Sequence, residues 1–550
     1  MATISLCIIV RDEETMLPAC LASVAGVVDE IVLVDTGSRD GTLALARAAG
    51  ARVFEQPWGD NFSAPRNLAI AESRGDWVLV LDADERLTLG AREALLAAVA
   101  ADDFDCGMLP LSTAERLDAE VEAVVQGTDR LGDVAYLPRL MRRTPDLRFD
   151  GIVHENVGQW LFANARKAKL LPGIDIVHFG AVPDLRRLRD KSARNIRLLE
   201  RFCAQHPGDL TPYGYLAHEY FDVGEHARAR EVADRGWAVL LGGAKTLELP
   251  VLRLVTARAW LEVQRGEPEA ADATLAVAVR LLAEHPDVFF IRGCAAEMKA
   301  LHCGTEARRQ ELLALALADY ELAIGCANRV YLQKFIAGGA GWAAQVRCGT
   351  VLLLLGRAEA ALAAFERALA ENGSAREASW GRVEALLAVG AMREAFRDVK
   401  PLLDERPDGW TLAAVTAEAV GSLDAMGQWL GKAQSLLGAG FVAPHRRELY
   451  HDALASLGSF LERPVSVPGP LGKFAALASG TSPDVVVSSA RGLRDPIVRG
   501  MARRLVTHWL RSGKVENVER LVTPMAERVL PGVTELVTAV VNELTGECSP

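Results

Sequence analysis

The first 85 residues alternate between short apolar runs and amphipathic stretches, and this alternation constrains the fold more than any other feature. Helix-compatible segments separate runs that have the length of a strand. The apolar runs are ISLCIIV (4–10), EIVLVD (30–35), ARVFEQ (51–56) and WVLVLD (77–82), and the helical segments are 14–25, 41–49 and 64–73. Nearly continuous apolar strands separated by helices are typical of a parallel sheet that helices cover on both faces. We therefore expect an α/β domain at the N-terminus.

Polar side chains follow several of these strands at the point where each strand ends. Arg11 and Asp12 follow the first strand, Asp35 ends the second, and Asp82 and Asp84 end the fourth. Ligands of open parallel sheets bind at the carboxyl ends of the strands. A buried carboxylate is costly unless it is paired or bound to a metal. The sequence therefore predicts that this edge holds something positive, unless it is only a solvated loop.

Asp82 and Asp84 form a D-x-D pattern. In an extended chain, residues two apart point to the same side. Two carboxylate ligands there suit Mg²⁺ or Mn²⁺ held together with a diphosphate. The alternative is that Glu85 and one of the two aspartates only cap a helix or stay solvated, because an isolated D-x-D pattern is common by chance.

Strand patterns fade after about residue 184, and alanine- and leucine-rich helical patterns replace them. Segments 356–373 and 390–407 resemble the second half of a tetratricopeptide repeat. Gly356 and Gly390 are 34 residues apart, which is the period of that repeat. Weaker copies lie at 215–240, 257–282 and 510–521. The sequence therefore predicts a helical repeat array, with an alanine-rich bundle lacking true repeats as the alternative.

These patterns divide the 550 residues into five segments. We expect an α/β domain at 1–183, a connecting helix or hinge at 184–212, helical repeats at 213–461, a Pro/Gly linker at 462–472 and a C-terminal helical region at 473–550. Lys191, Arg194 and Asn195 are interpreted as part of the hinge. The segment 112–135 receives no role from its sequence.

Composition narrows the classes of function. The chain has 61 Lys and Arg against 72 Asp and Glu, a formal net charge of −11, which argues against a general nucleic-acid binder. Its nine cysteines are irregularly spaced without a C-x-x-C pair, which favours free thiols in a reducing compartment. We find no signal peptide and no stretch near the ~20 apolar residues of a membrane span. We therefore expect a soluble, cytoplasmic protein.

Three stretches together resemble a known family. They are ISLCIIVRDEETMLPACLASVAGVVDEIVLVDTGSRDGT, WGDNFSAPRNLAIAESRGDWVLVLDADERL and RLMRRTPDLRFDGIVHENV. Their order and spacing resemble a family-2 glycosyltransferase with the GT-A fold, over about residues 3–200. The nearest subgroups are lipopolysaccharide-core glycosyltransferases and repeat-bearing enzymes that glycosylate bacteriocin peptides on cysteine or serine. One departure is the first loop, R-N-E-E in these relatives, which reads Arg11-Asp12-Glu13-Glu14 here.

The resemblance implies a donor site. Residues implied to contact the nucleotide-sugar are Arg11, Asp12, Asp35, Asp60, Arg66, Asp82, Ala83 and Asp84. The implied ligands of a divalent Mn or Mg ion are Asp82, Asp84 and His178, and a neutral imidazole is a suitable ligand for such an ion. Two alternatives remain: Asp35 could cap the TGSRDGT turn, and Arg66 could form a surface salt bridge.

The resemblance also implies a catalytic loop at His154 and Glu155. Displacement at a sugar carbon requires removal of the acceptor proton, and a carboxylate within hydrogen-bond reach can remove it. Glu155 is the candidate general base and His154 its orienting neighbour, although the roles could be reversed. Arg139, Arg142 and Arg143 are either substrate contacts or a solvated basic edge.

The sequence therefore predicts an inverting, metal-dependent glycosyltransferase with a nucleotide-diphosphate donor, expected to be a UDP-sugar. Repeat arrays form interaction surfaces, so we expect them to bind a peptide or protein acceptor, or to form a homodimer. Alternatives are a saccharide or lipid-linked acceptor, and a repeat scaffold with an inactive GT-A domain. Nucleotidyl transfer is disfavoured because residues 5–20 contain no glycine for a phosphate loop.

Overall fold

The structure is a computed structural model and divides into two compact units. Residues up to 288 form the first unit together with 328–338, and the remaining residues form the second. The residues that the structure describes are 2–180, 182, 191–243, 248–282, 284–404, 406–436, 453, 457, 496–523 and 533–545. Within these residues, no helix combines the length and the hydrophobicity needed to cross a membrane.

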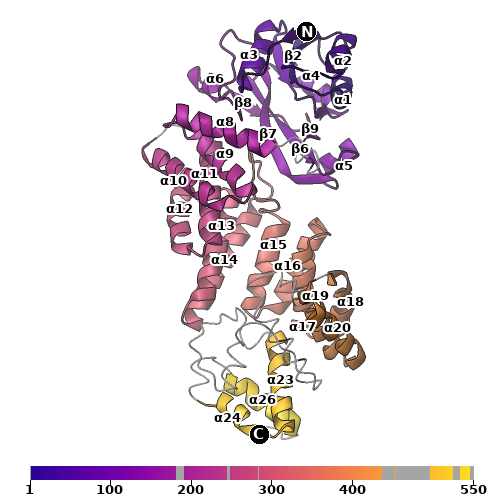
Figure 1. Ribbon diagram of the computed structural model, residues 1–550, viewed down its shortest axis with the longest axis vertical. Coiled ribbons are helices and arrows are strands. Elements are labelled where there is room, and N and C mark those ends of the chain that lie inside the picture. Colours follow the sequence, from indigo (N-terminus) through magenta and orange to yellow (C-terminus); the bar gives the residue numbers. More distant parts are fainter. Residues whose placement is uncertain are drawn as a thin grey trace. The chain divides into compact units, whose positions relative to one another are not determined.

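The first unit begins with the parallel sheet that the sequence predicts (Figure 1). Its strands run β3-β2-β1-β4, and each adjacent pair is parallel. Their bounds are β1 Ile4–Val10, β2 Glu30–Asp35, β3 Arg52–Glu55 and β4 Trp77–Val80, with helices α1 Leu17–Ser23, α2 Thr42–Ala48 and α3 Ser63–Glu72 between them. The strand ends therefore meet at one edge, as predicted.

The other half of the sheet is mixed, which the sequence did not predict. β7 pairs antiparallel with both β4 and β6, and β9 pairs antiparallel with β5. The elements are β5 Glu85–Leu87, α4 Ala91–Ala101, β6 Cys106–Ala114, α5 Val121–Gln126, β7 Arg130–Arg142, α6 Gly158–Ala163, β8 Ala168–Leu170 and β9 Ile176–His178. The unassigned segment 112–135 thus contains the end of β6, the helix α5 and the start of β7.

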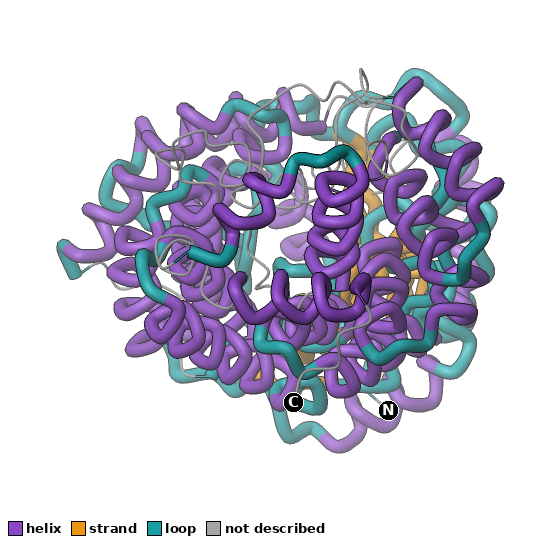
Figure 2. Tube along the Cα trace, turned by 90° about the horizontal axis from the view of Figure 1, so that it is seen from below, coloured by secondary structure: helices purple, strands orange, loops and turns teal. Residues whose placement is uncertain are grey.

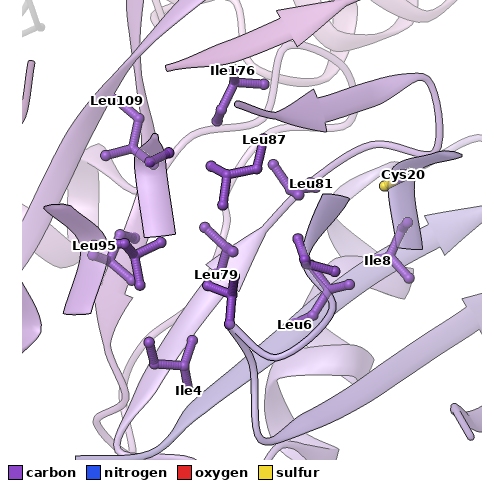
Figure 3. Packing of buried hydrophobic residues seen from close by; sticks show 14 of the residues in the cluster. Ile4, Leu6, Ile8, Cys20, Leu79, Leu81, Leu87, Leu95, Leu109 and Ile176 are labelled. Carbon is purple, nitrogen blue, oxygen red and sulfur yellow. The ribbon is translucent and has the colours of Figure 1, made fainter. Parts of the chain in front are cut away.

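One core holds the two halves of the sheet together. Side chains from β1 and β4 point towards those of β5, β6 and β9 in Figure 3, with Leu95 of α4 closing the cluster. Ile4, Leu79 and Ile176 are fully buried. Burying an aliphatic side chain of this kind contributes about 1.5–3 kcal/mol, so the mixed half is fixed relative to the parallel strands.

Helices follow the sheet within the same unit. They are α8 Lys191–Gln205, α9 Thr211–Asp222, α10 His226–Leu241, α11 Glu248–Gln264 and α12 Pro268–Leu281. α9 packs against α8, α10 and α11. The segment 328–338 returns to this unit, where Leu332 accepts a backbone hydrogen bond of 2.8 Å from Tyr136 of β7. The first helices are therefore continuous with the sheet domain.

The second unit consists of helices over its described residues, and Figure 2 shows helix as the dominant structure of the chain. Its elements are α13 Pro286–His302, α14 Glu306–Gly325, α15 Trp342–Leu354, α16 Ala358–Glu371, α17 Arg376–Ala388, α18 Met392–Asp398, η1 Lys400–Leu402, α19 Pro407–Ala419, α20 Leu423–Ser435, α23 Pro496–Arg511, α24 Val515–Leu521 and α26 Val533–Thr545. The first residues of α13, 286–288, belong to the first unit. Neighbouring helices pack in pairs. The predicted linker at 462–472 lies outside the described residues.

Glycines at the turns between helices explain why the repeats could be recognised in the sequence. Gly224, Gly356 and Gly390 each lie at the turn between two helices, with φ of +81°, +73° and +83°. Glycine adopts this left-handed conformation without steric cost, so it ends one helix and allows the next to fold back. The glycines 34 residues apart therefore mark equivalent turns, and the tetratricopeptide-like prediction is confirmed.

Gly381→Ala should destabilise the second unit by about 1–3 kcal/mol, because a Cβ there would lie 2.2 Å from the ring of Phe365 on the neighbouring helix. Gly431→Ala is the matched control: it is also a helical glycine, but nothing lies within 4 Å of its added Cβ. Gly431→Ala should stabilise the second unit by about 0.5–1 kcal/mol, because alanine is more favourable than glycine inside a helix. Urea unfolding followed by circular dichroism compares the two, and equal midpoints would contradict the packing.

Candidate active site

Helix α3 fixes the loop 149–156 that follows β7. The Asn67 side chain brackets Phe149: its Nδ2 donates to the carbonyl oxygen at 2.9 Å, and the Phe149 amide donates to its Oδ1 at 2.7 Å. The Ser63 hydroxyl donates a third hydrogen bond to this loop, to the Gly151 carbonyl. The loop is therefore held by the same helix that carries Arg66.

Arg66 joins this loop to the edge of the sheet. Its Nη2 lies 2.7 Å from Oδ1 of Asp82, and its Nε lies 2.5 Å from Oε1 of Glu155. Burial alone would lower the pKa of Arg66, but the two carboxylates outweigh it and raise the pKa above its ordinary value. Its Nη1 is buried and has no hydrogen-bond partner. The alternative of a surface salt bridge is therefore wrong, because Arg66 is only 7% exposed.

Glu85 and Arg139 extend the charged cluster beneath Asp82. Arg139 Nη2 contacts Glu85 and lies 3.5 Å from Oδ2 of Asp82. Burial raises the pKa of Glu85 to about 7, against the opposing effect of Arg139. Desolvation would likewise raise the pKa of Asp82, but Arg66 and Arg139 hold it well below its ordinary value. Arg139 Nε is buried without a hydrogen-bond partner.

Asp84 faces a different set of groups. β5 and β9 pair Glu85 with His178, and this register brings His178 Nε2 to 3.6 Å from Oδ1 of Asp84. Lys191 Nζ lies 3.9 Å from Oδ2 and donates to the Gly180 carbonyl at 2.8 Å. Burial would raise the pKa of Asp84 and lower that of His178, but their mutual attraction reverses both shifts.

The two aspartates of the D-x-D pattern diverge because the chain turns there. The Glu85 amide donates to the Asp82 carbonyl at 3.0 Å, which closes a turn in place of the extended geometry expected from the sequence. Within the described part of the chain, no three His, Cys, Asp or Glu side chains are grouped as metal ligands. Asp84 and His178 lie together, whereas Asp82 faces the arginines.

Arg11, Asp12 and Asp35 lie where two loops meet. Asp35 accepts from the amides of Gly37 at 3.0 Å and Ser38 at 3.1 Å, so it caps the turn after β2. Asp12 has a left-handed φ of +54°, and its amide donates to the Ser38 hydroxyl at 2.9 Å. Arg11 and Asp12 are exposed. A nucleotide contact by these residues stays a prediction.

Asp60 and Ala83 complete the predicted donor set. Asp60 accepts hydrogen bonds from Arg197 at 2.5 and 2.8 Å, and its carbonyl accepts from Arg201 at 2.6 Å. Arg197 and Arg201 belong to α8, so Asp60 attaches that helix to the sheet domain. Its pKa is lowered to about 2 by the hydrogen bond from Arg197. Ala83 is buried between the two aspartates.

Of the three arginines in PRLMRR, Arg139 contacts the carboxylates of Asp82 and Glu85, whereas Arg142 and Arg143 bind elsewhere. Arg142 pairs with Asp105 at 3.3 Å, and Arg143 donates to the Gly75 carbonyl at 2.6 Å. Arg142 and Arg143 therefore secure the edge of the sheet, and Arg139 alone among the three contacts the predicted site.

His154 is held from the helical side. Its ring stacks on Tyr215 of α9, with centroids 3.9 Å apart and planes at 12°. Burial, together with the cations Arg253 and Arg194, lowers the pKa of His154 to about 3, so the imidazole is neutral. Its Nε2 is buried without a hydrogen-bond partner. The loop therefore contacts both the sheet domain and the helices.

Comparison with known proteins decides the family of the sheet domain. Residues 5–118 match the family described as Glycosyl transferase family 2. The N-terminal domain is a family-2 glycosyltransferase domain. It carries the GT-A-like sheet that the sequence predicts, and a tetratricopeptide-like helical region follows it.

Three relatives illustrate the similarity. A TPR repeat-containing protein of Synechococcus elongatus is 40% identical over 38% of this chain and 50% of its own length. An uncharacterized glycosyltransferase of Rickettsia felis is 36% identical over 16% of this chain and 31% of its own. The SPbeta prophage-derived glycosyltransferase SunS of Bacillus subtilis is 23% identical over 37% and 46%. The chain thus matches half or less of the length of these relatives.

Sequence reasoning missed four residues of the site in the glycosyltransferase domain and its adjoining helices. Glu85 follows the D-x-D pattern directly and lies between the charged residues Asp84 and Arg86, so its neighbours gave no signal that it is buried. Lys191 was interpreted as a hinge residue, yet it contacts Asp84. Tyr215 and Arg253 come from the helices, and nothing in their local sequence indicates that Tyr215 stacks on His154 or that Arg253 contacts the Tyr215 ring.

Arg66→Met should destabilise the glycosyltransferase domain by about 3 kcal/mol, because it leaves the buried Glu155 carboxylate without its cation. Arg148→Met is the control, since Arg148 is 68% exposed in its pair with Asp150 and should cost at most about 1 kcal/mol. Urea denaturation monitored by tryptophan fluorescence measures both. Equal losses would show that Arg66 does not stabilise the cluster.

Proposed function

We propose that this protein is an inverting glycosyltransferase that moves a sugar from a nucleotide-diphosphate donor, expected to be a UDP-sugar, to an acceptor nucleophile. One observation carries the proposal: the guanidiniums of Arg66 and Arg139 each keep a buried N–H without a partner beside Asp82. Buried polar groups are otherwise almost always hydrogen-bonded. Phosphate oxygens match guanidinium geometry and charge, so a donor diphosphate would satisfy both groups.

A divalent ion fits beside this position. Asp84 and His178 are an oxygen and a nitrogen ligand of the type that Mn²⁺ and Mg²⁺ use, and they already face each other. Gly180 makes room for them, because a Cβ there would lie 1.7 Å from Asp84 Oδ2. A bound ion would supply Lewis-acid stabilisation of the leaving diphosphate. Asp82 would then orient Arg66 and Arg139 towards the donor.

Glu155 is the proposed general base. It lies on the loop that Asn67 and Ser63 hold, and Arg66 fixes one of its oxygens. The acceptor nucleophile would form a bond to the anomeric carbon as the bond from that carbon to the diphosphate oxygen breaks. The acceptor proton would pass to Glu155, and the electron pair would leave with the nucleotide diphosphate. A single displacement of this kind inverts the anomeric configuration.

The helical region supports a peptide or protein acceptor. Helical repeats stack into extended binding surfaces, and the relative from Synechococcus elongatus is itself named for such repeats. A saccharide or lipid-linked acceptor is the alternative, and a binding scaffold with an inactive domain is the second. The protein can be incubated with a donor and candidate peptides or oligosaccharides, and their intact masses measured. The acceptor is the molecule whose mass increases by one hexose or N-acetylhexosamine residue.

Gly180→Ala should abolish metal-dependent donor binding, since the added Cβ occupies the space of the Asp84 carboxylate. Gly208→Ala is the control, because nothing lies within 4 Å of its Cβ. Calorimetry with a panel of UDP- and GDP-sugars, with and without Mn²⁺, measures binding to each variant and to Asp84→Ala. Failure of every sugar nucleotide to bind the folded wild type would refute the donor site.

Glu155→Gln should lower kcat by about 10²–10⁴-fold, the usual contribution of a general base. Its KM for the donor should change little, because the amide keeps the shape of the carboxylate. Release of the nucleoside diphosphate, by transfer or by hydrolysis of the donor, provides the readout. Unchanged turnover in Glu155→Gln would assign the base to another residue.

A further inference from the structure

Loop 150–156, which carries Glu155, is a strained turn that needs external support. The amides of Asp150 and Asn156 donate to each other's carbonyls at 2.9 and 3.0 Å, so the residues between them form a closed tip. Within that tip His154 adopts a left-handed φ of +53°. This conformation is unfavourable for a residue other than glycine. It persists only where surrounding contacts hold the residue in place. The sheet domain holds one side of the loop, through Asn67 and Ser63.

The other side of the loop is held by a stack of planar groups. The His154 ring lies on Tyr215, and the guanidinium carbon of Arg253 lies 4.1 Å from the Tyr215 ring centroid. The same guanidinium lies 4.3 Å from the ring of Phe335. The groups come from the loop, α9, α11 and the segment 328–338, and all belong to the first compact unit. We call these four residues the ring stack.

The far end of the ring stack is itself anchored. The Phe335 amide donates to Oδ2 of Asp287 at 2.7 Å, and the adjacent Lys334 pairs with Asp133 at 3.2 Å. Gln333 accepts from Arg253 Nη2 at 3.1 Å. Phe335 cannot move away from Arg253 without breaking these contacts. The ring stack therefore packs against His154 from a fixed position.

We propose that Tyr215 and Arg253, which belong to the helical region, are positioning residues for the glycosyl transfer: they fix His154 by stacking and thereby hold the adjacent Glu155 in the geometry for proton abstraction. This inference rests on the proposed function, in which Glu155 is the base. It assigns the first helices a part in the catalytic site itself, in addition to any acceptor binding by the repeats.

The charge of Arg253 supports this role. Arg253 and Arg194 oppose a positive charge on the imidazole, and burial acts in the same direction. A neutral His154 does not compete with Arg66 for the Glu155 carboxylate. The Glu155 side chain therefore has a single cationic partner among these groups, at its Oε1 atom.

The test compares Tyr215→Ala with Tyr215→Phe, which retains the ring. Hydrolysis of the sugar nucleotide selected by calorimetry, measured as release of nucleoside diphosphate with Mn²⁺, gives kcat and KM without a known acceptor. Tyr215→Ala should lose about 100-fold in kcat, the scale of a misplacement near 1 Å. Its donor KM should stay within about two-fold, and Tyr215→Phe should restore kcat. Phe221→Ala is the control, because Phe221 lies on α9 like Tyr215 but stacks separately, on His226 at the start of α10.

Wild-type turnover in Tyr215→Ala, alongside a loss in Glu155→Gln, would overturn this inference and leave the proposed function intact. A loss as large in Phe221→Ala would reduce Tyr215 to a structural role and overturn it as well. If the wild type neither binds nor turns over any donor, the proposed function fails. NMR of histidine-labelled protein then tests the stack: the His154 resonance should be ring-current shifted and move on Tyr215→Ala, and an unchanged position would refute the contact.

Discussion

The two-sided pairing of Arg66 is the interaction on which the rest of the site depends. One nitrogen binds Asp82 at the end of the parallel sheet, and another binds Glu155 on a loop far along the chain. Removing one partner of a buried ion pair costs more than the pair contributes, because it leaves the other charge unpaired. Asn67, the next residue, fixes the backbone of the same loop. Helix α3 thus sets the distance between the sheet edge that carries Asp82 and the candidate base Glu155.

Two groups of residues contact the loop 150–156 from different sides. The charged cluster of Arg66, Arg139, Asp82 and Glu85 reaches it through Arg66, and the ring stack reaches it from the helices. Arg66 and Arg139 keep hydrogen-bonding capacity unused next to Asp82, a cost that a diphosphate would remove on binding. Tyr215 and Arg253 support His154 from the helices. The glycosyltransferase domain therefore does not end where its sheet ends, since its proposed catalytic loop is complete only with α9 and α11 in place.

The sequence allowed the local features to be predicted. Apolar runs such as Ile4–Val10 need burial on both faces, so the parallel order and the edge carrying Asp82 and Asp84 followed from periodicity. The repeat turns followed from Gly356 and Gly390, whose spacing is the 34-residue period of the repeat. The turn at Asp82 to Glu85 was not predicted, because a hydrogen bond three residues apart overrides the extended geometry.

Long-range contacts were beyond sequence reasoning for a physical reason. Asp60 has a motif position typical of a donor contact, yet Arg197 and Arg201 bind it from a helix about 140 residues later. Tyr215 has an ordinary helical setting, and only the fold brings it to His154. Such pairs depend on where two elements meet, which neither periodicity nor spacing encodes.

A crystal structure of the full chain with Mn²⁺ and UDP would test the central claim most directly. The account predicts that diphosphate oxygens accept hydrogen bonds from Arg66 Nη1 and Arg139 Nε, with the ion held by Asp84 and His178. Arg66 should keep both Asp82 and Glu155 as partners. A diphosphate bound elsewhere, or an Arg66 that releases Glu155 to reach it, would contradict the account.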